Sequence, residues 1–339
     1  MAPPLSSIET AGADNGATYA ALDLGTNNCR LLMARAQTKE GRAGFHVIEA
    51  FSRIVRLGEG LASTGLLSEA AMTRTIEALK ICAHKVAERR VRSARYVATE
   101  ACRRASNCAE FLERVRTSTG IALETISSGE EAQLMVAGCV PLLTRDTPHA
   151  LVFDIGGGST ELVWLTLPAD ANKPPVIEGY LSVPQGVVTL ADRYDGRDVN
   201  AATYAAMVAE MREALAPFDA RFGISALIGE GKVQMLGSSG TVTMLTALHL
   251  NLPRYIRARV DGYSLDFPAI ERATSRLAAM SHAERALHPC IGHERADLVL
   301  AGCAVLEAIC RLWPVGRLAV ADRGIREGIL MNLVGKRGN

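Results

Sequence analysis

Apolar residues along the chain follow two spacings, and each change of spacing marks the boundary of a predicted element. Short apolar runs at 18–24, 94–99 and 149–155 predict buried strands. Apolar positions three or four residues apart predict an amphipathic helix between Ser68 and Arg90. Further helices are predicted at 108–120, 129–140, 200–218, 294–310 and 325–334. This mixture of strands and helices predicts an α/β fold.

One pattern occurs twice, with its two Asp residues, Asp23 and Asp154, 131 positions apart. It consists of an apolar strand containing an Asp, a turn of small residues and a second apolar strand. The copies read "LDLGTNNCRLLM" from Leu22 and "FDIGGGSTELVW" from Phe153. We expect two α/β domains, one per copy, with the two turns facing each other across a cleft.

The domain boundaries follow from this repeat. A chain of 339 residues is long enough for two domains, each with its own core. We expect the first domain at 19–140 and the second at 141–335. Residues 1–18, which are rich in Ala, Ser, Gly and Pro, are expected to form a flexible tail.

Composition excludes several classes of protein. The formal net charge of +1 gives no sign of a nucleic-acid or membrane-surface protein. No signal peptide and no apolar run long enough to span a bilayer is present, so we expect a cytoplasmic protein. The eight cysteines lack C-x-x-C spacing, which indicates reduced core residues and neither a zinc site nor a disulfide framework.

The segment 80–116 is locally basic, with ten Lys or Arg against four Glu. Such charge runs are usually the solvated face of a helix, and we favour that interpretation. The alternative is a docking surface for a polyanion.

Three segments of small residues are candidate phosphate-binding loops. A turn of Gly, Ser, Thr and Asn can direct several backbone amides at one anion, and glycine permits close approach. Most glycine-rich turns are only turns, but three in one chain, two of them following an Asp, indicate phosphate binding. The candidates are Gly25, Thr26 and Asn27; Gly156, Gly157, Gly158 and Ser159; and Gly237, Ser238, Ser239, Gly240 and Thr241.

Carboxylates beside these turns are candidate metal ligands. Asp23 and Asp154 lie at predicted strand ends, and Glu161 follows the triglycine turn. Magnesium favours one or two carboxylates together with phosphate oxygens and water. The alternative for a single Asp of this kind is a hydrogen bond that stabilises the turn.

Phosphoryl transfer needs positioning, charge neutralisation and a group that deprotonates the nucleophile. Glu131 is the candidate base, since it lies in the first turn of a predicted helix directly before the second copy of the repeat. Helix capping is its alternative role. Arg103 can clamp a terminal phosphate with two hydrogen bonds, and a surface ion pair is its alternative.

With these residues assembled, the chain resembles the exopolyphosphatase and guanosine pentaphosphate phosphohydrolase family of the actin-like superfamily, from about Tyr19 to Val334. The motifs that carry the resemblance are "ALDLGTNNCRLLMAR", "VATEACRRA", "ISSGEEAQLM", "VFDIGGGSTELV", "MLGSSGTVT", "RADLVLAGCAVL" and "VADRGIREGIL". It implies two actin-like (ribonuclease H-like) domains with the active site in the cleft between them.

The resemblance also implies roles. Glu131 matches the family's general base, and Asp154 and Glu161 match its magnesium ligands, for which Mn²⁺ can substitute. The phosphate-contacting positions are matched by Asp23, Thr26, Asn27, Arg103, the amides of Gly156–Gly158 and the Gly237–Thr241 loop. A homodimer is expected from family likeness alone.

The chain departs from the family pattern at three points. The glycine before the Glu pair is shifted by one position in Ile126-Ser127-Ser128-Gly129-Glu130-Glu131-Ala132, so the turn before the base can differ. Thr26 and Asn28 replace the commoner Ser but retain hydrogen-bonding capacity. Longer members carry a C-terminal helical extension, and its absence here argues against processive gripping of very long chains.

The leading hypothesis is a Mg²⁺-dependent exopolyphosphatase, and the alternative within the class is a 5′-phosphohydrolase of guanosine pentaphosphate (pppGpp). The basic segment favours polyphosphate. Two further alternatives are an ATP-dependent kinase or chaperone ATPase and a binding regulator without turnover. Glu130-Glu131 argues against the kinase, and the presence of Glu131, Asp154 and Glu161 argues against the regulator. Neither a nucleic acid nor a membrane is an expected partner.

Overall fold

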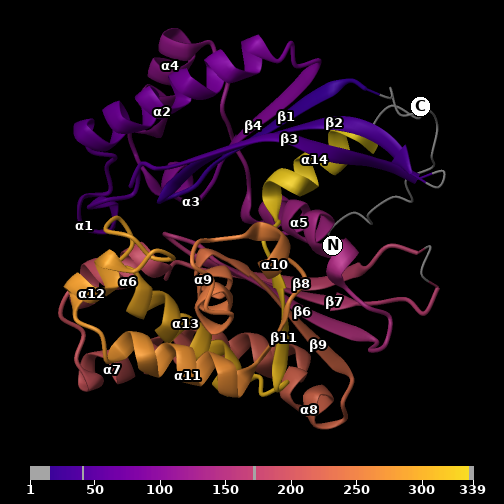
Figure 1. Cartoon of the computed structure of the whole chain (residues 1–339), viewed down its shortest axis with the longest axis vertical. Helices are drawn as coiled ribbons and strands as arrows, with labels where there is room; N and C mark the ends of the chain where they lie inside the picture. The colour runs from indigo at the N-terminus through magenta and orange to yellow at the C-terminus, as the bar shows by residue number, and fades with distance from the viewer. Residues whose placement is uncertain (1–15, 40–41, 171–172, 336–339) are drawn as a thin grey trace. The chain divides into compact units, whose positions relative to one another are not determined.

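The computed structural model describes residues 16–39, 42–170 and 173–335 (Figure 1). They divide into two compact units. The central unit is Pro141–Asp322, and the N-terminal unit contains 16–140 together with 323–335. Both are mixed α/β structures, as predicted. Residues 1–15 of the expected tail lie outside the described residues, and Thr18 already begins the first strand.

The N-terminal unit contains a sheet of five strands in the order β3-β2-β1-β4-β5. The strands are β1 (Thr18–Leu24), β2 (Asn28–Lys39), β3 (Arg42–Ile54), β4 (Ser93–Ala98) and β5 (Glu124–Thr125). β1, β2 and β3 form an antiparallel meander, whereas β4 pairs parallel with β1 and β5 parallel with β4. The carboxyl ends of β1, β4 and β5 therefore lie at one edge of the sheet.

Helices cover both faces of this sheet. Alternate β1 residues Ala20 and Leu22 pack with α2 (Glu69–Glu88) and α4 (Cys108–Thr119). Tyr19 and Ala21 point to the other face, where they pack with α5 (Ser128–Cys139) and α14 (Ile325–Gly335). Because β1 is buried on both faces, its sequence is a continuous apolar run rather than an alternating one. The short helices α1 (Leu61–Thr64) and α3 (Glu100–Arg104) lie between these elements.

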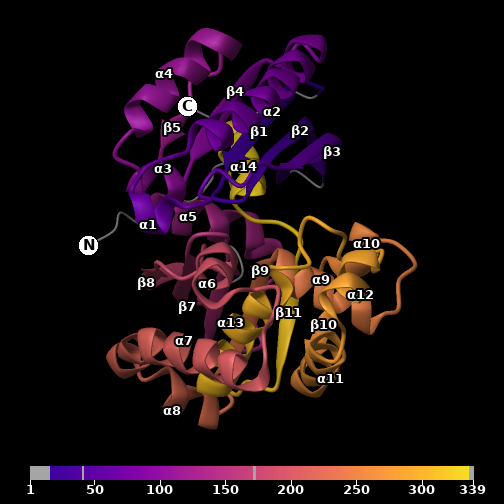
Figure 2. The same cartoon turned by 90° about the vertical axis from the view of Figure 1, so that its left-hand side faces the viewer.

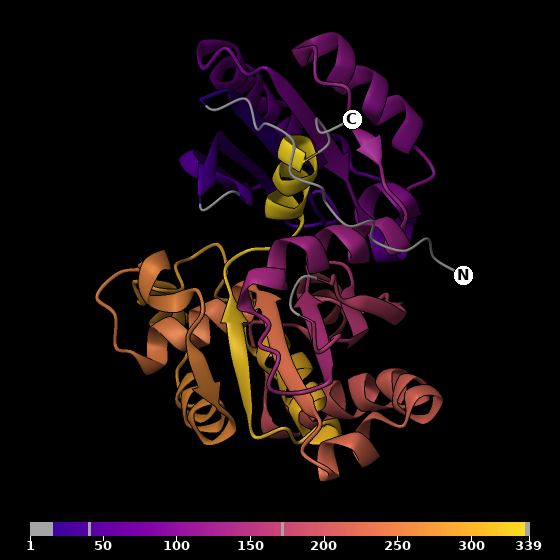
Figure 3. The same cartoon turned by 90° about the vertical axis from the view of Figure 1, so that its right-hand side faces the viewer.

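Helix α14 follows the central unit in sequence but packs within the N-terminal unit (Figure 3). Its fully buried residues Ile329 and Leu330 join the core that contains Leu134 of α5. The two helices touch at their backbones, since a Cβ atom added to Gly328 would lie 1.9 Å from the Leu134 carbonyl oxygen. The second domain predicted at 141–335 is therefore too long, because the compact central unit ends at Asp322.

The central unit contains six strands in the order β10-β11-β9-β6-β7-β8. They are β6 (His149–Ile155), β7 (Thr160–Thr166), β8 (Val176–Val183), β9 (Val233–Ser239), β10 (Ser264–Asp266) and β11 (Arg317–Ala321). β6, β7 and β8 form an antiparallel meander, and β9 and β11 continue the sheet in parallel from β6. This is the arrangement of the N-terminal sheet with β10 added, so the internal repeat extends from the two turns to the whole sheets.

The helices of the central unit form a single large core with one face of its sheet (Figure 2). They are α6 (Val187–Tyr194), α7 (Ala201–Phe222), α8 (Ile224–Gly229), α9 (Gly240–His249), α10 (Arg257–Val260), α11 (Phe267–Ala278), α12 (His282–Leu287) and α13 (Val299–Leu312). Leu151, Phe153 and Ile155 of β6 point into this core. A 3-10 turn, Val140–Leu142, precedes the unit. Within the described residues, no helix is long and apolar enough to cross a bilayer.

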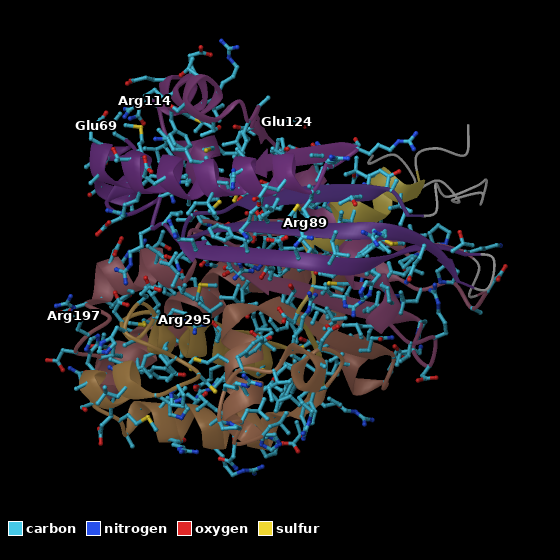
Figure 4. All side chains as sticks on the ribbon, turned by 45° about the horizontal axis from the view of Figure 1, so that its top comes forward. Glu69, Arg89, Arg114, Glu124, Arg197 and Arg295 are labelled. Atoms are coloured by element: carbon cyan, nitrogen blue, oxygen red, sulfur yellow. The ribbon has the colours of Figure 1, made fainter. Side chains whose placement is uncertain are left out.

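The basic segment 80–116 is largely neutralised by ion pairs. At least eight of its ten Lys and Arg residues contact a carboxylate of the described part of the N-terminal unit. Figure 4 shows Arg114 close to Glu69, to which its guanidinium is bonded at 2.9 Å. Arg89 is bonded to Glu49 at 2.7 Å. This pairing favours the solvated helix face over a docking surface for a polyanion.

All eight cysteines are free. Six of them are buried and two are half-buried. No group of three or more His, Cys, Asp or Glu side chains suited to a metal occurs in the described part of the chain. The cysteines are therefore small core residues.

Candidate active site

The candidate residues of the N-terminal unit follow the carboxyl ends of its parallel strands. Asp23 and the first turn end β1, Arg103 follows β4, and Glu131 follows β5. Loops at this edge of an α/β sheet are the usual place for ligands. The topology thus brings all of these sequence candidates to one edge of the unit.

The first turn is a tight connection between β1 and β2. The Gly25 amide donates to the Asn28 carbonyl oxygen at 2.9 Å and closes the turn. Thr26 and Asn27 are buried, and their amides donate to no acceptor within the described residues. The Oδ1 atom of Asn27 is also buried and unpartnered among those residues. Orphaned polar groups of this kind indicate a place for a ligand or water.

Asp23 lies at the end of β1, paired in register with Arg30 on β2. Burial raises the pKa of the Asp23 carboxyl above its ordinary value. The guanidinium groups of Arg30 and Arg326 act in the opposite direction and lower that pKa, whereas the Glu327 carboxylate raises it. Removing water from a carboxylate disfavours its charged form, and nearby cations offset part of this cost.

Arg103, which is half-buried, forms an ion pair with the buried Glu131. The Arg103 Nη1 donates to Glu131 Oε2 at 2.6 Å and to the Ile126 carbonyl oxygen at 3.1 Å. The other edge of the guanidinium holds Glu100 Oε2 through Nη2 at 2.8 Å. Burial lowers the pKa of Arg103, but the carboxylates of Glu131 and Glu100 outweigh it and leave that pKa raised. Arg103 therefore remains charged and orients the Glu131 carboxylate.

The two adjacent glutamates at the start of α5 have different surroundings. Ser127 caps the helix by accepting the Glu130 amide at 3.2 Å, so the shifted glycine does not prevent a normal N-terminus. Glu130 points to the surface, where it contacts Arg95 at 2.6 Å. Glu131 is only 6% exposed. Ser127 therefore caps the helix, and the Glu131 carboxylate is bonded to Arg103.

The second turn repeats the geometry of the first. The Gly156 amide donates to the Ser159 carbonyl oxygen at 2.9 Å, as Gly25 donates to Asn28. The amides of Gly157 and Gly158 donate to no acceptor in the described ranges of the chain. Two adjacent amides without a partner are a ready-made site for an anion.

Asp154 and Glu161 face each other across the hairpin of β6 and β7. Directly paired residues on antiparallel strands have Cβ atoms about 5 Å apart, so both carboxylates lie within reach of one cation. Hydroxyl groups of Ser159 and Ser182 donate to Glu161 Oε1 at 2.5 and 2.9 Å. The other oxygen, Oε2, lies beside Gly156, 3.8 Å from where a Cβ atom of that residue would be. Glu161 is therefore a fixed carboxylate turned toward the turn.

These residues fit a magnesium ion by their chemistry. Asp154 and Glu161 supply hard oxygen ligands, and Ser238 of β9 lies beside Asp154 in register. Mg²⁺ takes one or two carboxylates and completes its shell with water and phosphate oxygens, so a third acidic side chain is not required.

The third predicted loop, 237–241, is not a turn. Gly237, Ser238 and Ser239 are the end of β9, and Gly240 and Thr241 begin α9 without any loop between them. Gly237 is glycine for packing, because a Cβ atom there would lie 2.6 Å from the Phe153 ring. Ser239 caps α9 by accepting the Val242 amide at 2.9 Å. The part of this segment that can bind a phosphate is the start of α9, a ten-residue helix whose first backbone amides have no partner inside the helix.

The structure therefore groups the sequence candidates into two sets. Asp23, Gly25, Thr26, Asn27, Arg103 and Glu131 lie at one edge of the N-terminal sheet, and the remaining candidates lie at the corresponding edge of the central sheet. Sequence reasoning missed Glu100, although its spacing of three from Arg103 on one helix was a usable signal. It also missed Arg30, whose place opposite Asp23 requires the strand register.

Three comparisons relate most of the chain to known proteins. A profile described as the Ppx/GppA phosphatase family matches residues 36–337. Exopolyphosphatase 2 of Mycobacterium tuberculosis is 30% identical over 326 residues, which cover 93% of this chain and 98% of that protein. The crystal structure of the Aquifex aeolicus family member has a TM-score of 0.75 at 28% identity, covering 95% of this chain and 99% of the other. An exopolyphosphatase from Cytophaga hutchinsonii shares the fold, with a TM-score of 0.82, 24% identity and coverage of 94% and 98%.

Proposed function

Because the chain belongs to the Ppx/GppA phosphatase family, we propose that it is an exopolyphosphatase that needs Mg²⁺. It hydrolyses the terminal phosphoanhydride bond of inorganic polyphosphate and releases orthophosphate. One observation carries the proposal: Asp154 and Glu161 are paired beside a turn whose Gly157 and Gly158 amides lack an acceptor within the described residues. Carboxylates for a cation next to donors for an anion suit a metal-bound phosphate.

The proposal gives the two units different tasks. In the N-terminal unit, Glu131 takes a proton from the attacking water while Arg103 holds the carboxylate in place. The water oxygen forms a bond to the terminal phosphorus, and the bond from phosphorus to the bridging oxygen breaks in line with it. In the central unit, Asp154 and Glu161 would hold the metal, and Gly157 and Gly158 bind phosphate oxygens. Bound Mg²⁺ supplies charge neutralisation on the phosphate oxygens.

The pppGpp 5′-phosphohydrolase is the alternative activity, since its substrate presents the same terminal bond. The relatives named exopolyphosphatase support polyphosphate. The basic segment 80–116 does not favour polyphosphate over pppGpp, because most of its cations are paired with carboxylates. The homodimer and the cytoplasmic location stay predictions.

The test is orthophosphate release from polyphosphate of defined length and from pppGpp, with Mg²⁺ and with a chelator. We expect metal-dependent release that Glu131→Gln lowers by about a hundredfold or more, the range contributed by a general base. Glu130→Gln is the matched control. Glu130 is adjacent to Glu131 in sequence, but its carboxylate contacts Arg95 at the surface, so this variant should retain activity. Faster release of orthophosphate from pppGpp than from polyphosphate would identify pppGpp as the substrate. Binding of both substrates without release would contradict the hydrolase.

A further inference from the structure

The back of the triglycine turn is held by the first turn of α6. The Val187 amide donates to the Gly156 carbonyl oxygen at 3.0 Å, and the Val188 amide donates to that of Gly157 at 2.8 Å. The Thr189 amide also reaches the Gly157 oxygen at 3.4 Å. The first amides of a helix have no partner inside the helix, so these two carbonyls satisfy them.

This contact determines where the amides of the turn point. A trans peptide unit is planar, and its C=O and N–H bonds point in opposite directions. With the Gly156 carbonyl bound to α6, the Gly157 amide must point away from α6. The bound Gly157 carbonyl turns the Gly158 amide away in the same manner. These are the two amides that donate to no acceptor among the described residues.

Gly186 and Thr189 keep α6 at this distance. A Cβ atom on Gly186 would lie 2.5 Å from the Gly157 carbonyl oxygen and 2.6 Å from that of Gly156, so any side chain would push the turn and the helix apart. The Gly186 amide donates to Thr189 Oγ1 at 2.8 Å, and that hydroxyl donates back to the Gly186 carbonyl oxygen at 3.1 Å. The Thr189 hydroxyl thus fixes the glycine on which the close approach depends.

The N-terminal unit also has its turn held through two carbonyls, but one residue further along, because Gly25 corresponds to Gly156 in the bond that closes each turn. The Gly58 amide donates to the Thr26 carbonyl oxygen at 2.9 Å, and the Val55 and Arg56 amides donate to that of Asn27 at 2.9 and 3.0 Å. In both units the donors come from the segment after the third strand of the meander. Both copies therefore bind two carbonyls of the turn from behind, but only in the second copy do the held carbonyls precede both of the amides that lack an acceptor among the described residues.

We propose that Gly186 and Thr189 are positioning residues for phosphate binding. They hold α6 against the carbonyls of the triglycine turn, and the amides of Gly157 and Gly158 consequently point at the terminal phosphate. This inference rests on the proposed function, which supplies the phosphate that the two amides bind.

The experiment measures binding of imidodiphosphate, whose P–N–P bridge resists hydrolysis, by calorimetry with Mg²⁺ on the full chain. Gly186→Ala should raise the dissociation constant about tenfold, the cost of one hydrogen bond to a charged group. Thr189→Val, which removes the hydroxyl and keeps the shape, should raise it about threefold or more. Thr189→Ser should restore an affinity close to that of the parent chain.

Gly179→Ala is the matched control. Its Cβ atom would meet the Phe222 ring at 2.2 Å, so this substitution also introduces a clash in the same unit, but the three atoms nearest to that Cβ belong to Phe222 and not to the turn. It should lower the melting temperature and leave the dissociation constant unchanged. If Gly179→Ala weakens binding as much as Gly186→Ala does, the effect is one of stability and the inference is wrong.

The remaining outcomes separate this inference from the proposed function. Unchanged affinity in Gly186→Ala overturns the inference, as does a parent chain that does not bind imidodiphosphate. Should Gly186→Ala fail to fold, unchanged affinity in Thr189→Val overturns it. Weakened binding in these variants, together with no polyphosphate hydrolysis by the parent, supports the inference and rejects the exopolyphosphatase.

Discussion

The two copies of the hairpin have the same backbone and opposite electrostatics. Each turn is closed by the same 2.9 Å hydrogen bond, from Gly25 to Asn28 and from Gly156 to Ser159. Across the strands, however, Asp23 is paired with Arg30, whereas Asp154 is paired with Glu161. The first copy therefore carries its own cation, and the second gathers two carboxylates. The two turns thus differ at one position, where the first has a cation opposite its Asp and the second has a carboxylate.

The largest expected effect distinguishes the two aspartates. Asp154→Asn should lower the rate of orthophosphate release about a thousandfold, the upper range for losing one electrostatic contact to a transition state. Asp23→Asn should lower it less, because Arg30 remains beside the turn. Steady-state rates across a Mg²⁺ titration measure both, with Glu130→Gln as the control. Equal losses would show that the register partners do not divide the work between the copies.

The second prediction compares the glycines behind the turns. Gly58→Ala should weaken imidodiphosphate binding by less than the roughly tenfold expected for Gly186→Ala. The added Cβ on Gly58 meets the Thr26 Cγ2 atom at 2.2 Å, which is a side-chain methyl group, whereas the one on Gly186 meets two backbone carbonyls. Calorimetry on both variants makes the comparison. A larger effect at Gly58 would assign the main phosphate contact to the first turn.

The third prediction concerns the pH dependence of stability. Since burial raises the folded-state pKa of Asp23, the stability that this carboxyl contributes is fully present below its ordinary value of 3.8 and is lost as the pH rises through the raised pKa. Asn cannot ionise, so Asp23→Asn should raise the melting temperature at neutral pH by an amount that declines as the pH falls. Thermal unfolding between pH 5 and pH 8 measures this. A lower melting temperature at neutral pH would mean that the Arg30 pairing outweighs the cost of burial.

The smallest expected effect is that of a substitution at Arg114, which lies outside both hairpins. Arg114 is paired at the surface with Glu69, whose side chain is 71% exposed. Exposed pairs contribute about 0.5 kcal/mol, so Arg114→Ala should scarcely change stability. Affinity for long-chain polyphosphate should also stay unchanged. A clear loss of that affinity at low salt would restore the basic segment as a docking surface for a polyanion.

Local sequence patterns predicted the elements that are both long and regular. The helix expected between Ser68 and Arg90 is α2, and the helix expected to close at Gly120 is α4, which Gly120 ends in a left-handed conformation. The strand β3, by contrast, was not predicted, because many of its residues are half-buried or exposed and its apolar pattern is weak. An apolar pattern is clear only where the residues are buried, and a strand at the edge of a sheet is less buried than a central strand.

The other wrong predictions concern contacts between residues that are far apart in the sequence. The last helix was predicted as a helix, but its sequence cannot tell which sheet it covers, so α14 was placed with the wrong unit. The small residues at 237–239 suggested a turn, whereas their size serves the packing of Gly237 on Phe153. Candidate residues were found from their chemistry, while their grouping depends on strand order. The roles given to these residues stay predictions.

The placement of α14 bears on how the protein is made. The ribosome releases the sheet residues of the N-terminal unit first, but Ile329 and Leu330, which cover one face of that sheet, emerge only after the whole central unit. Until then Tyr19, Ala21 and Leu32 lack part of their apolar cover. Domains generally fold as units during synthesis, so the central unit can complete its fold before its predecessor does. The unit that is translated first therefore cannot be completed until the last helix is made, and until then one face of its sheet leaves apolar side chains uncovered.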